Sequence, residues 1–153
     1  MKRPRTLLLW IALLAVAAAV RLPSLPAGLP YMSYVDEGHV LHRVSHLLRE
    51  RTWDPKFYIY PSLPFYAIAL PVAAWSPVYA ALHDRPLRAD LSPAPRRRYE
   101  LLYPQELIVA GRLVTLAFSL GLVLLTGLLA RRLAGPAAGF IAAWLAALLP
   151  AFV

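Results

Sequence analysis

Apolar residues gather in long blocks along this chain, and the blocks predict helices that meet a membrane. Residues 1–22 are apolar after a basic start, residues 107–130 are apolar apart from Arg112, and residues 137–153 carry no charge. About 20 apolar residues cross a hydrocarbon core of about 30 Å. We therefore expect an all-α, polytopic membrane protein with about three transmembrane helices.

The first apolar run is short for a span, which leaves two interpretations open. Leu7–Val20 is uncharged and rises about 21 Å at about 1.5 Å per residue. A snorkelling Arg21 would lengthen it. The alternative is a cleaved signal peptide with a basic start and a cleavage site within Ala17–Ala19. In both cases the N-terminus stays in the cytoplasm and the residues that follow emerge outside.

Residues 34–49 have the period of an amphipathic helix. Ser33, followed three residues later by Asp36, is typical of a capping box at a helix start. Such a helix can lie in the membrane interface with its apolar face towards the lipid. The apolar positions are Val40, Leu41, Val44, Leu47 and Leu48, and the polar positions are His39, His42, Arg43, His46 and Glu50.

Two adjacent carboxylates, Asp36 and Glu37, fall in the first turn of this helix. The chain has eight acidic residues against 16 basic ones, and carboxylates near lipid usually act chemically or are paired. The simpler alternative is ordinary first-turn charge, which the helix dipole favours by up to about 1 kcal/mol.

The histidines of the helix are a candidate metal site. His39, His42 and His46 share one face, and three imidazoles can bind zinc. A solvated polar face explains them better, because positions seven residues apart are far apart for a single ion.

The next segment combines aromatic residues with prolines, which is typical of a rigid turn at headgroup depth. It runs from Trp53 to Leu63 and contains Tyr60 and Pro61. Residues 63–82 follow and are apolar enough to span. Their prolines favour a broken, re-entrant or surface helix instead.

Basic residues allow two topologies. With three spans, residues 23–106 form one external loop and residues 131–136 a cytoplasmic turn. With four spans, residues 63–82 also cross and Arg96–Arg98 become cytoplasmic. The positive-inside rule, applied by counting basic residues, favours four spans, but it weakens for loops longer than about 60 residues. Together with the prolines, this favours three.

Residues 107–130 form the clearest span. Ala117 and Gly121 have the spacing of small residues that lets two helices approach closely. Arg112 lies near the external end, where it either pairs with an acidic group or a lipid phosphate, or snorkels to the interface.

Composition agrees with a membrane protein. The chain is 59% hydrophobic and 16% charged, against about 25% charged in soluble domains. Its net charge of +8 is divided by apolar runs, so contact with anionic lipid fits better than nucleic-acid binding. Since there is no cysteine, disulfides and thiolate chemistry are excluded.

In this order, the features resemble the N-terminal part of the polyprenyl-phosphate-dependent GT-C glycosyltransferases. The closest group is family 39, which includes protein O-mannosyltransferases and lipid A aminoarabinose transferases. The Asp36-Glu37 pair opens the amphipathic helix. Tyr60–Leu63 then matches a Pro-Pro-Leu-type motif with serine in place of the second proline, and Arg131–Gly135 closes the spanning helix.

The resemblance implies transfer of a sugar from a polyprenyl phosphate to a protein, lipid or glycan acceptor. The reaction would take place outside the plasma (inner) membrane, with membrane lipid but no nucleic acid as a further partner. The resemblance assigns the catalytic base to Asp36. Glu37 would orient the acceptor, bind a metal or hold a structural cation. A divalent metal ion is an alternative source of charge for the leaving phosphate. The substrate-binding candidates are Arg112, Tyr60, Pro61 and His39.

Members of this family are several times longer than the chain, which stops inside its last apolar segment. We therefore expect an N-terminal fragment that lacks a second acidic motif and is inactive alone. Two other classes stay open. A transporter or flippase subunit would place its carboxylates near mid-membrane, and a structural anchor would tolerate Asp36→Asn.

Overall fold

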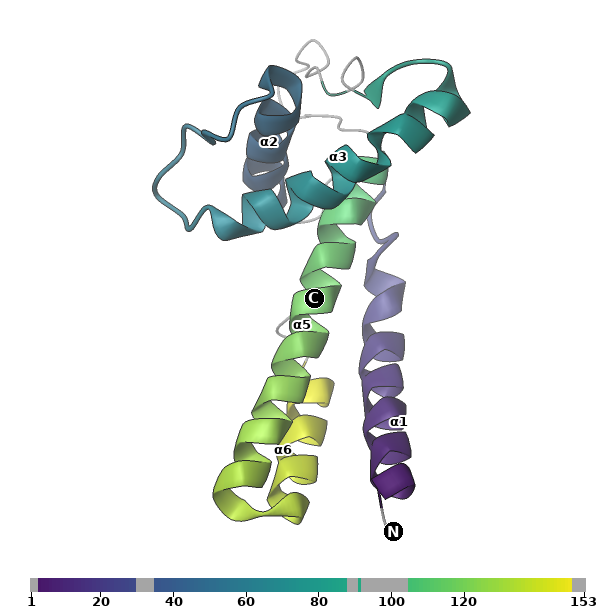
Figure 1. Cartoon of the computed structure of the whole chain (residues 1–153), viewed down its shortest axis with the longest axis vertical. Helices are drawn as coiled ribbons and strands as arrows, with labels where there is room; N and C mark the ends of the chain where they lie inside the picture. The colour runs from purple at the N-terminus through teal and green to yellow at the C-terminus, as the bar shows by residue number, and fades with distance from the viewer. Residues whose placement is uncertain (1–2, 30–34, 88–90, 92–104, 150–153) are drawn as a thin grey trace. The chain divides into compact units, whose positions relative to one another are not determined.

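The computed structural model describes residues 3–29, 35–87, 91 and 105–149, and within them every regular element is a helix. The all-α prediction is confirmed for this part of the chain, whereas Ser33 and Arg96–Arg98 lie outside it. The elements are α1 (Arg3–Arg21), the short 3-10 helix η1 (Leu22–Ser24), α2 (Val35–Glu50), α3 (Leu63–His83), α5 (Gln105–Ala134) and α6 (Pro136–Leu148) (Figure 1).

Three helical segments are long and apolar enough to cross a membrane: Thr6–Ser24, Leu63–His83 and Gln105–Ala134. The number agrees with the prediction, but the set differs, because α3 qualifies and α6 is shorter. The 13 residues of α6 rise about 20 Å, which is less than a hydrocarbon core. A span over residues 137–153 stays a prediction, since the last four residues lie outside the described ranges.

α3 is one continuous helix in spite of its prolines. Pro64 stands in the first turn, where a missing N–H breaks no helical hydrogen bond. Pro71 and Pro77 lie inside the helix, where each removes one. A broken segment was one of the three expected alternatives and is wrong. The helix persists because one face is buried against its neighbours, through Phe65, Ile68, Ala69, Val72 and Tyr79.

The chain divides into two compact units. Unit 1 comprises residues 1–25 and 115–153, and unit 2 comprises residues 26–114. The first ten residues of α5 therefore belong to unit 2 and the rest of that helix to unit 1.

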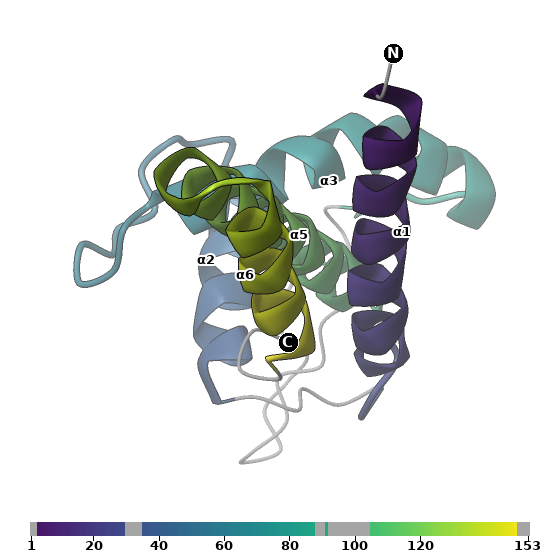
Figure 2. The ribbon, with the colours of Figure 1, turned by 90° about the horizontal axis from the view of Figure 1, so that it is seen from below.

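Unit 1 packs α1 beside α6 (Figures 1 and 2) around a small apolar core. A Cβ added at Gly127 would lie 2.5 Å from the Trp10 ring and 2.7 Å from the Cβ of Ala143, so only glycine fits there. A Cβ at Gly121 would meet nothing within 4 Å. No described residue therefore packs closely at Gly121, and close helix packing at Ala117 and Gly121 stays a prediction.

Arg21 does not snorkel, contrary to the prediction, and is only 2% exposed. Its guanidinium donates to the carbonyl oxygens of Ala17 in α1, at 3.0 Å, and Ala147 in α6, at 2.7 Å. Longer bonds reach Ala146 and Leu149. The last carbonyls of a helix lack helical partners, and the cation satisfies them at the negative end of the helix dipole. The C-terminal ends of α1 and α6 are thereby held together.

The predicted apolar face of α2 is confirmed, because its residues are buried within unit 2. The expectation that this face lies against lipid is wrong, since other helices of the protein cover it. The reason is that α3 and the first turns of α5 supply an apolar surface, and α3 crosses those turns rather than following them (Figure 1). The contacting residues are Leu41, Val44 and Leu47 of α2, Phe65, Ile68 and Val72 of α3, and Leu107 and Ile108 of α5.

We expect Gly127→Ala to destabilise unit 1 by about 1–3 kcal/mol, because the new methyl group overpacks the contact with Trp10 and Ala143. Thermal unfolding in detergent, followed by circular dichroism, measures the change. The matched control is Gly121→Ala in open space, which should be neutral or stabilising by up to about 1 kcal/mol. Equal effects of the two substitutions would contradict the packing described for unit 1.

Candidate functional site

Glu37 and Arg112 form a bidentate ion pair in unit 2. Nε of Arg112 donates to Oε1 of Glu37 at 2.7 Å, and Nη2 donates to Oε2 at 3.1 Å. The two side chains are only 12% and 10% exposed. Parallel N–H···O bonds of this kind are among the strongest polar contacts in proteins. Of the arrangements expected for Arg112, the structure shows pairing with an acidic group.

The same guanidinium also holds the chain segment before α2. Nη1 of Arg112 donates to the carbonyl oxygen of Ala27 at 2.7 Å. One cation thus connects three segments of unit 2: the stretch after η1, the first turn of α2 and the start of α5. Lysine could not replace it, because an ammonium group lacks the planar fork that matches a carboxylate.

The two neighbouring carboxylates have different surroundings. Glu37 is enclosed and occupied by Arg112, whereas Asp36 is exposed. Within the described residues, no hydrogen bond or ion pair holds the Asp36 carboxylate. Among the described residues, Asp36 is therefore an exposed carboxylate, and Glu37 belongs to the ion pair that holds the first turn of α2.

The histidines of α2 are not arranged as a metal site. In the described ranges no group of three or more His, Cys, Asp or Glu side chains can hold a metal ion. His39 and His42 are exposed, and His46 is half-buried with its Nε2 enclosed. Although the His42 side chain is exposed overall, its neighbours partly desolvate it, which lowers its pKa below the usual value, and the positive charge of Arg43 lowers the pKa further.

The loop between α2 and α3 is built around Asp54. Its Oδ1 accepts hydrogen bonds from the backbone N–H of Lys56 at 2.8 Å and the hydroxyl of Tyr58 at 2.5 Å. The bond from Tyr58 is the main reason that the pKa of Asp54 is lowered, and it raises the pKa of Tyr58. An aspartate that bonds the backbone two residues on is a common turn former.

The substrate-binding candidates Tyr60 and Pro61 are both exposed on this loop. Tyr60 packs edge-to-face on Phe57 with ring centroids 5.5 Å apart, and the guanidinium carbon of Arg43 lies 4.7 Å from the Phe57 ring centre. The loop is thus braced against α2. No hydrogen bond or ring contact within the described residues joins Tyr60 or Pro61 to the acidic pair.

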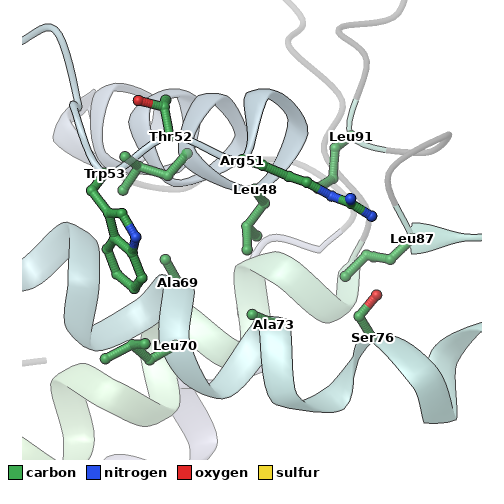
Figure 3. Close-up of a pocket in the computed structure, with 11 residues that line it drawn as sticks. Leu48, Arg51, Thr52, Trp53, Ala69, Leu70, Ala73, Ser76, Leu87 and Leu91 are labelled. Atoms are coloured by element: carbon green, nitrogen blue, oxygen red, sulfur yellow. The ribbon is translucent and has the colours of Figure 1, made fainter.

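A cavity of about 390 Å³ lies at the far end of α2 (Figure 3). Its lining is mostly apolar and comes from Leu47 and Leu48, Arg51–Trp53, one face of α3, and the pair Leu87 and Leu91. Leu47 is ten residues beyond Glu37, or about 15 Å along a helix. The cavity and the acidic pair are therefore separate features of unit 2.

The sequence analysis missed three features of this arrangement. The bond from Arg112 to Ala27 leaves no sequence signal, because any residue carries that carbonyl. A turn was predicted between Trp53 and Leu63, but the hydrogen bonds of Asp54 within it were not, although aspartate followed by proline is a frequent turn start. The cavity could not be foreseen, because it depends on how α2 and α3 cross.

No family model matches this chain. No curated protein and no solved structure is significantly similar to it either. What this protein does must therefore be inferred from its own residues and from the order of its motifs.

We expect Glu37→Gln to destabilise the protein by about 3 kcal/mol, because it leaves a buried guanidinium without a counter-charge. Asp36→Asn is the matched control. It removes a carboxylate from the neighbouring exposed position and should leave the thermal unfolding midpoint in detergent unchanged. If the two variants unfolded at the same temperature, Glu37 and Arg112 would not hold unit 2 together.

The lowered pKa of His42 predicts that acid weakens the fold. The unfolded chain, with an ordinary histidine pKa of about 6.5, binds a proton more readily than the folded one. The stabilisation is therefore complete above about pH 6.5 and is lost as the pH falls towards the folded-state pKa. Denaturant unfolding from pH 7.5 to 5 should show a smaller loss in His42→Gln. Identical slopes in His42→Gln and the wild type would refute the assignment.

Proposed function

We propose that this chain forms part of a membrane glycosyltransferase that takes a sugar from a polyprenyl phosphate at the outer face of the plasma (inner) membrane. The observation that supports the proposal most directly is the difference between the two carboxylates in the first turn of α2. Asp36 is exposed, while the adjacent Glu37 is locked by Arg112. The motif order that resembles family 39 supports the same class.

The position of the acidic pair favours an enzyme over a transporter. Asp36 and Glu37 lie outside all three segments that are apolar enough to span. Arg112, the cationic partner of Glu37, stands near the beginning of the third. Carboxylates of a transporter are expected near the middle of the bilayer, whereas groups that meet a lipid-linked sugar belong at its surface.

Sugar transfer needs one carboxylate that can accept a proton from the acceptor. An acceptor hydroxyl or amine attacks the anomeric carbon and loses its proton, the carbon–oxygen bond to the phosphate breaks, and the polyprenyl phosphate leaves. Asp36 takes the proton as general base, a role worth typically 10²–10⁴-fold in rate. Glu37 is ill suited to that role because its charge is already used by Arg112, so it acts by positioning. A divalent metal ion remains an alternative source of charge for the leaving phosphate.

The basic residues of unit 1 support a topology in which residues 26–114 face outward. α1 and α6 run in the same direction, as the bonds from Arg21 require. Arg131 and Arg132 stand at the end of α5, beside the turn to α6, and the chain has further basic residues at or just before the start of α1, namely Lys2, Arg3 and Arg5. By the positive-inside rule both basic segments lie in the cytoplasm. Residues 26–114 then follow α1 on the outer side.

α3 fits this topology as a helix lying on the outer leaflet. The face turned away from the core of unit 2 is apolar and exposed, through Leu63, Leu70, Trp75, Val78 and Leu82. α3 crosses the first turns of α5 (Figure 1). A helix with one face buried in protein and an exposed apolar face suits the membrane surface, where the exposed face meets lipid.

The test is the transfer activity of the full-length protein in membranes, assayed as movement of a radiolabelled sugar from polyprenyl phosphate to an acceptor. Asp36→Asn should lower turnover by at least about 10²-fold, since the base is lost while the shape is kept. Asp84→Asn is the control, because Asp84 is exposed at the end of α3 in a left-handed conformation that asparagine accepts. Normal turnover of Asp36→Asn would refute the assignment, and transbilayer movement of the lipid without sugar transfer would indicate a flippase.

A further inference from the structure

The cavity at the end of α2 has a polar side and an apolar side. Figure 3 shows the Arg51 side chain extending along the cavity, so that its guanidinium lies towards Leu87, Leu91 and the hydroxyl of Ser76. The indole of Trp53 lies on the opposite side. A ligand that fits this lining has one anionic group and one hydrocarbon portion.

The walls of the cavity are held in place by the protein itself. Ser45 donates a hydrogen bond to the carbonyl oxygen of Leu91 at 2.8 Å, and both residues are buried. Tyr66 donates to the carbonyl oxygen of Trp53 at 2.7 Å, and their rings lie 6.1 Å apart. The cavity is therefore shaped before any ligand arrives, which lowers the cost of binding.

The size and lining agree with a binding site for a small amphiphile. Ligand sites usually measure about 300–1,000 Å³ and combine apolar walls with a few polar groups, and this cavity measures about 390 Å³. Leu70 lines it and also belongs to the exposed apolar face of α3. A hydrocarbon chain can therefore enter from the lipid without crossing water.

We propose that this cavity binds an anionic glycerophospholipid of the surrounding membrane. The phosphate lies beside Arg51, whose guanidinium pairs well with phosphate oxygens, and Ser76 donates a further hydrogen bond. One acyl chain fills the space between Trp53 and Leu70. The ligand is a bulk lipid rather than the sugar donor, because the cavity is about 15 Å along α2 from Glu37. The proposal does not depend on the proposed sugar transfer.

Native mass spectrometry of the purified protein in a neutral detergent tests this, with phosphatidylglycerol and diacylglycerol as probes, because diacylglycerol has the same hydrocarbon chains but no phosphate. Phosphatidylglycerol should bind about tenfold more tightly, the effect of one charge-assisted contact. Arg51→Gln should remove most of that preference. Lys56→Gln is the matched control, because Lys56 is also an exposed cation but does not line the cavity. The two residues have similar backbone conformations, with φ of 48° at Lys56 and 51° at Arg51.

A second pair of variants tests the site by its volume. Ala73→Trp fills the cavity and should reduce binding of both lipids at least about tenfold, whereas Ala74→Trp, on an adjacent position that does not line it, should bind as wild type. Equal binding of the two lipids, or the same affinity in Arg51→Gln as in wild type, would overturn the proposal. So would tighter binding of a polyprenyl phosphate that displaces phosphatidylglycerol. Thermal unfolding of each variant checks that it is folded.

Discussion

A nearly enclosed pair of opposite charges, Glu37 and Arg112, is the contact on which the organisation of unit 2 depends. It brings the start of α2 to the start of α5 and adds the backbone of Ala27. Neither charge could be buried alone, since an uncompensated ion costs several kcal/mol. The pair therefore fixes where α2 begins, and with it the position of Asp36, whose side chain stays outside the pair.

The two ends of the amphipathic helix α2 present different chemical groups. The first turn presents charge, and the last turns present the apolar wall of a cavity. The face between them packs on α3 and α5. A helix that joins an exposed carboxylate to an apolar cavity suits a protein whose surroundings are amphiphilic. This division explains why polar groups cluster at separate places on a mostly apolar chain.

Much of the fold could be predicted from periodicity, because helical spacing and apolar length are local properties. The apolar face of α2 and the first spanning segment follow from such patterns. What covers a face, and which turn of a helix meets its neighbour, depends on tertiary packing. For that reason the close approach at Gly127 was not predicted, and Arg21 is enclosed instead of reaching the interface. In the candidate site, the sequence indicates the carboxylates, but only the geometry separates the enclosed one from the open one.

The most direct test of the central claim, that Asp36 stands exposed on the outer face of the membrane, is single-cysteine labelling in intact cells. The chain has no cysteine of its own, so Asp36→Cys and Ala134→Cys each report one position. A maleimide that cannot cross the membrane should label position 36 in intact cells and position 134 only after the cells are permeabilised. Labelling in the opposite order, or no labelling of position 36 in either state, would contradict the claim.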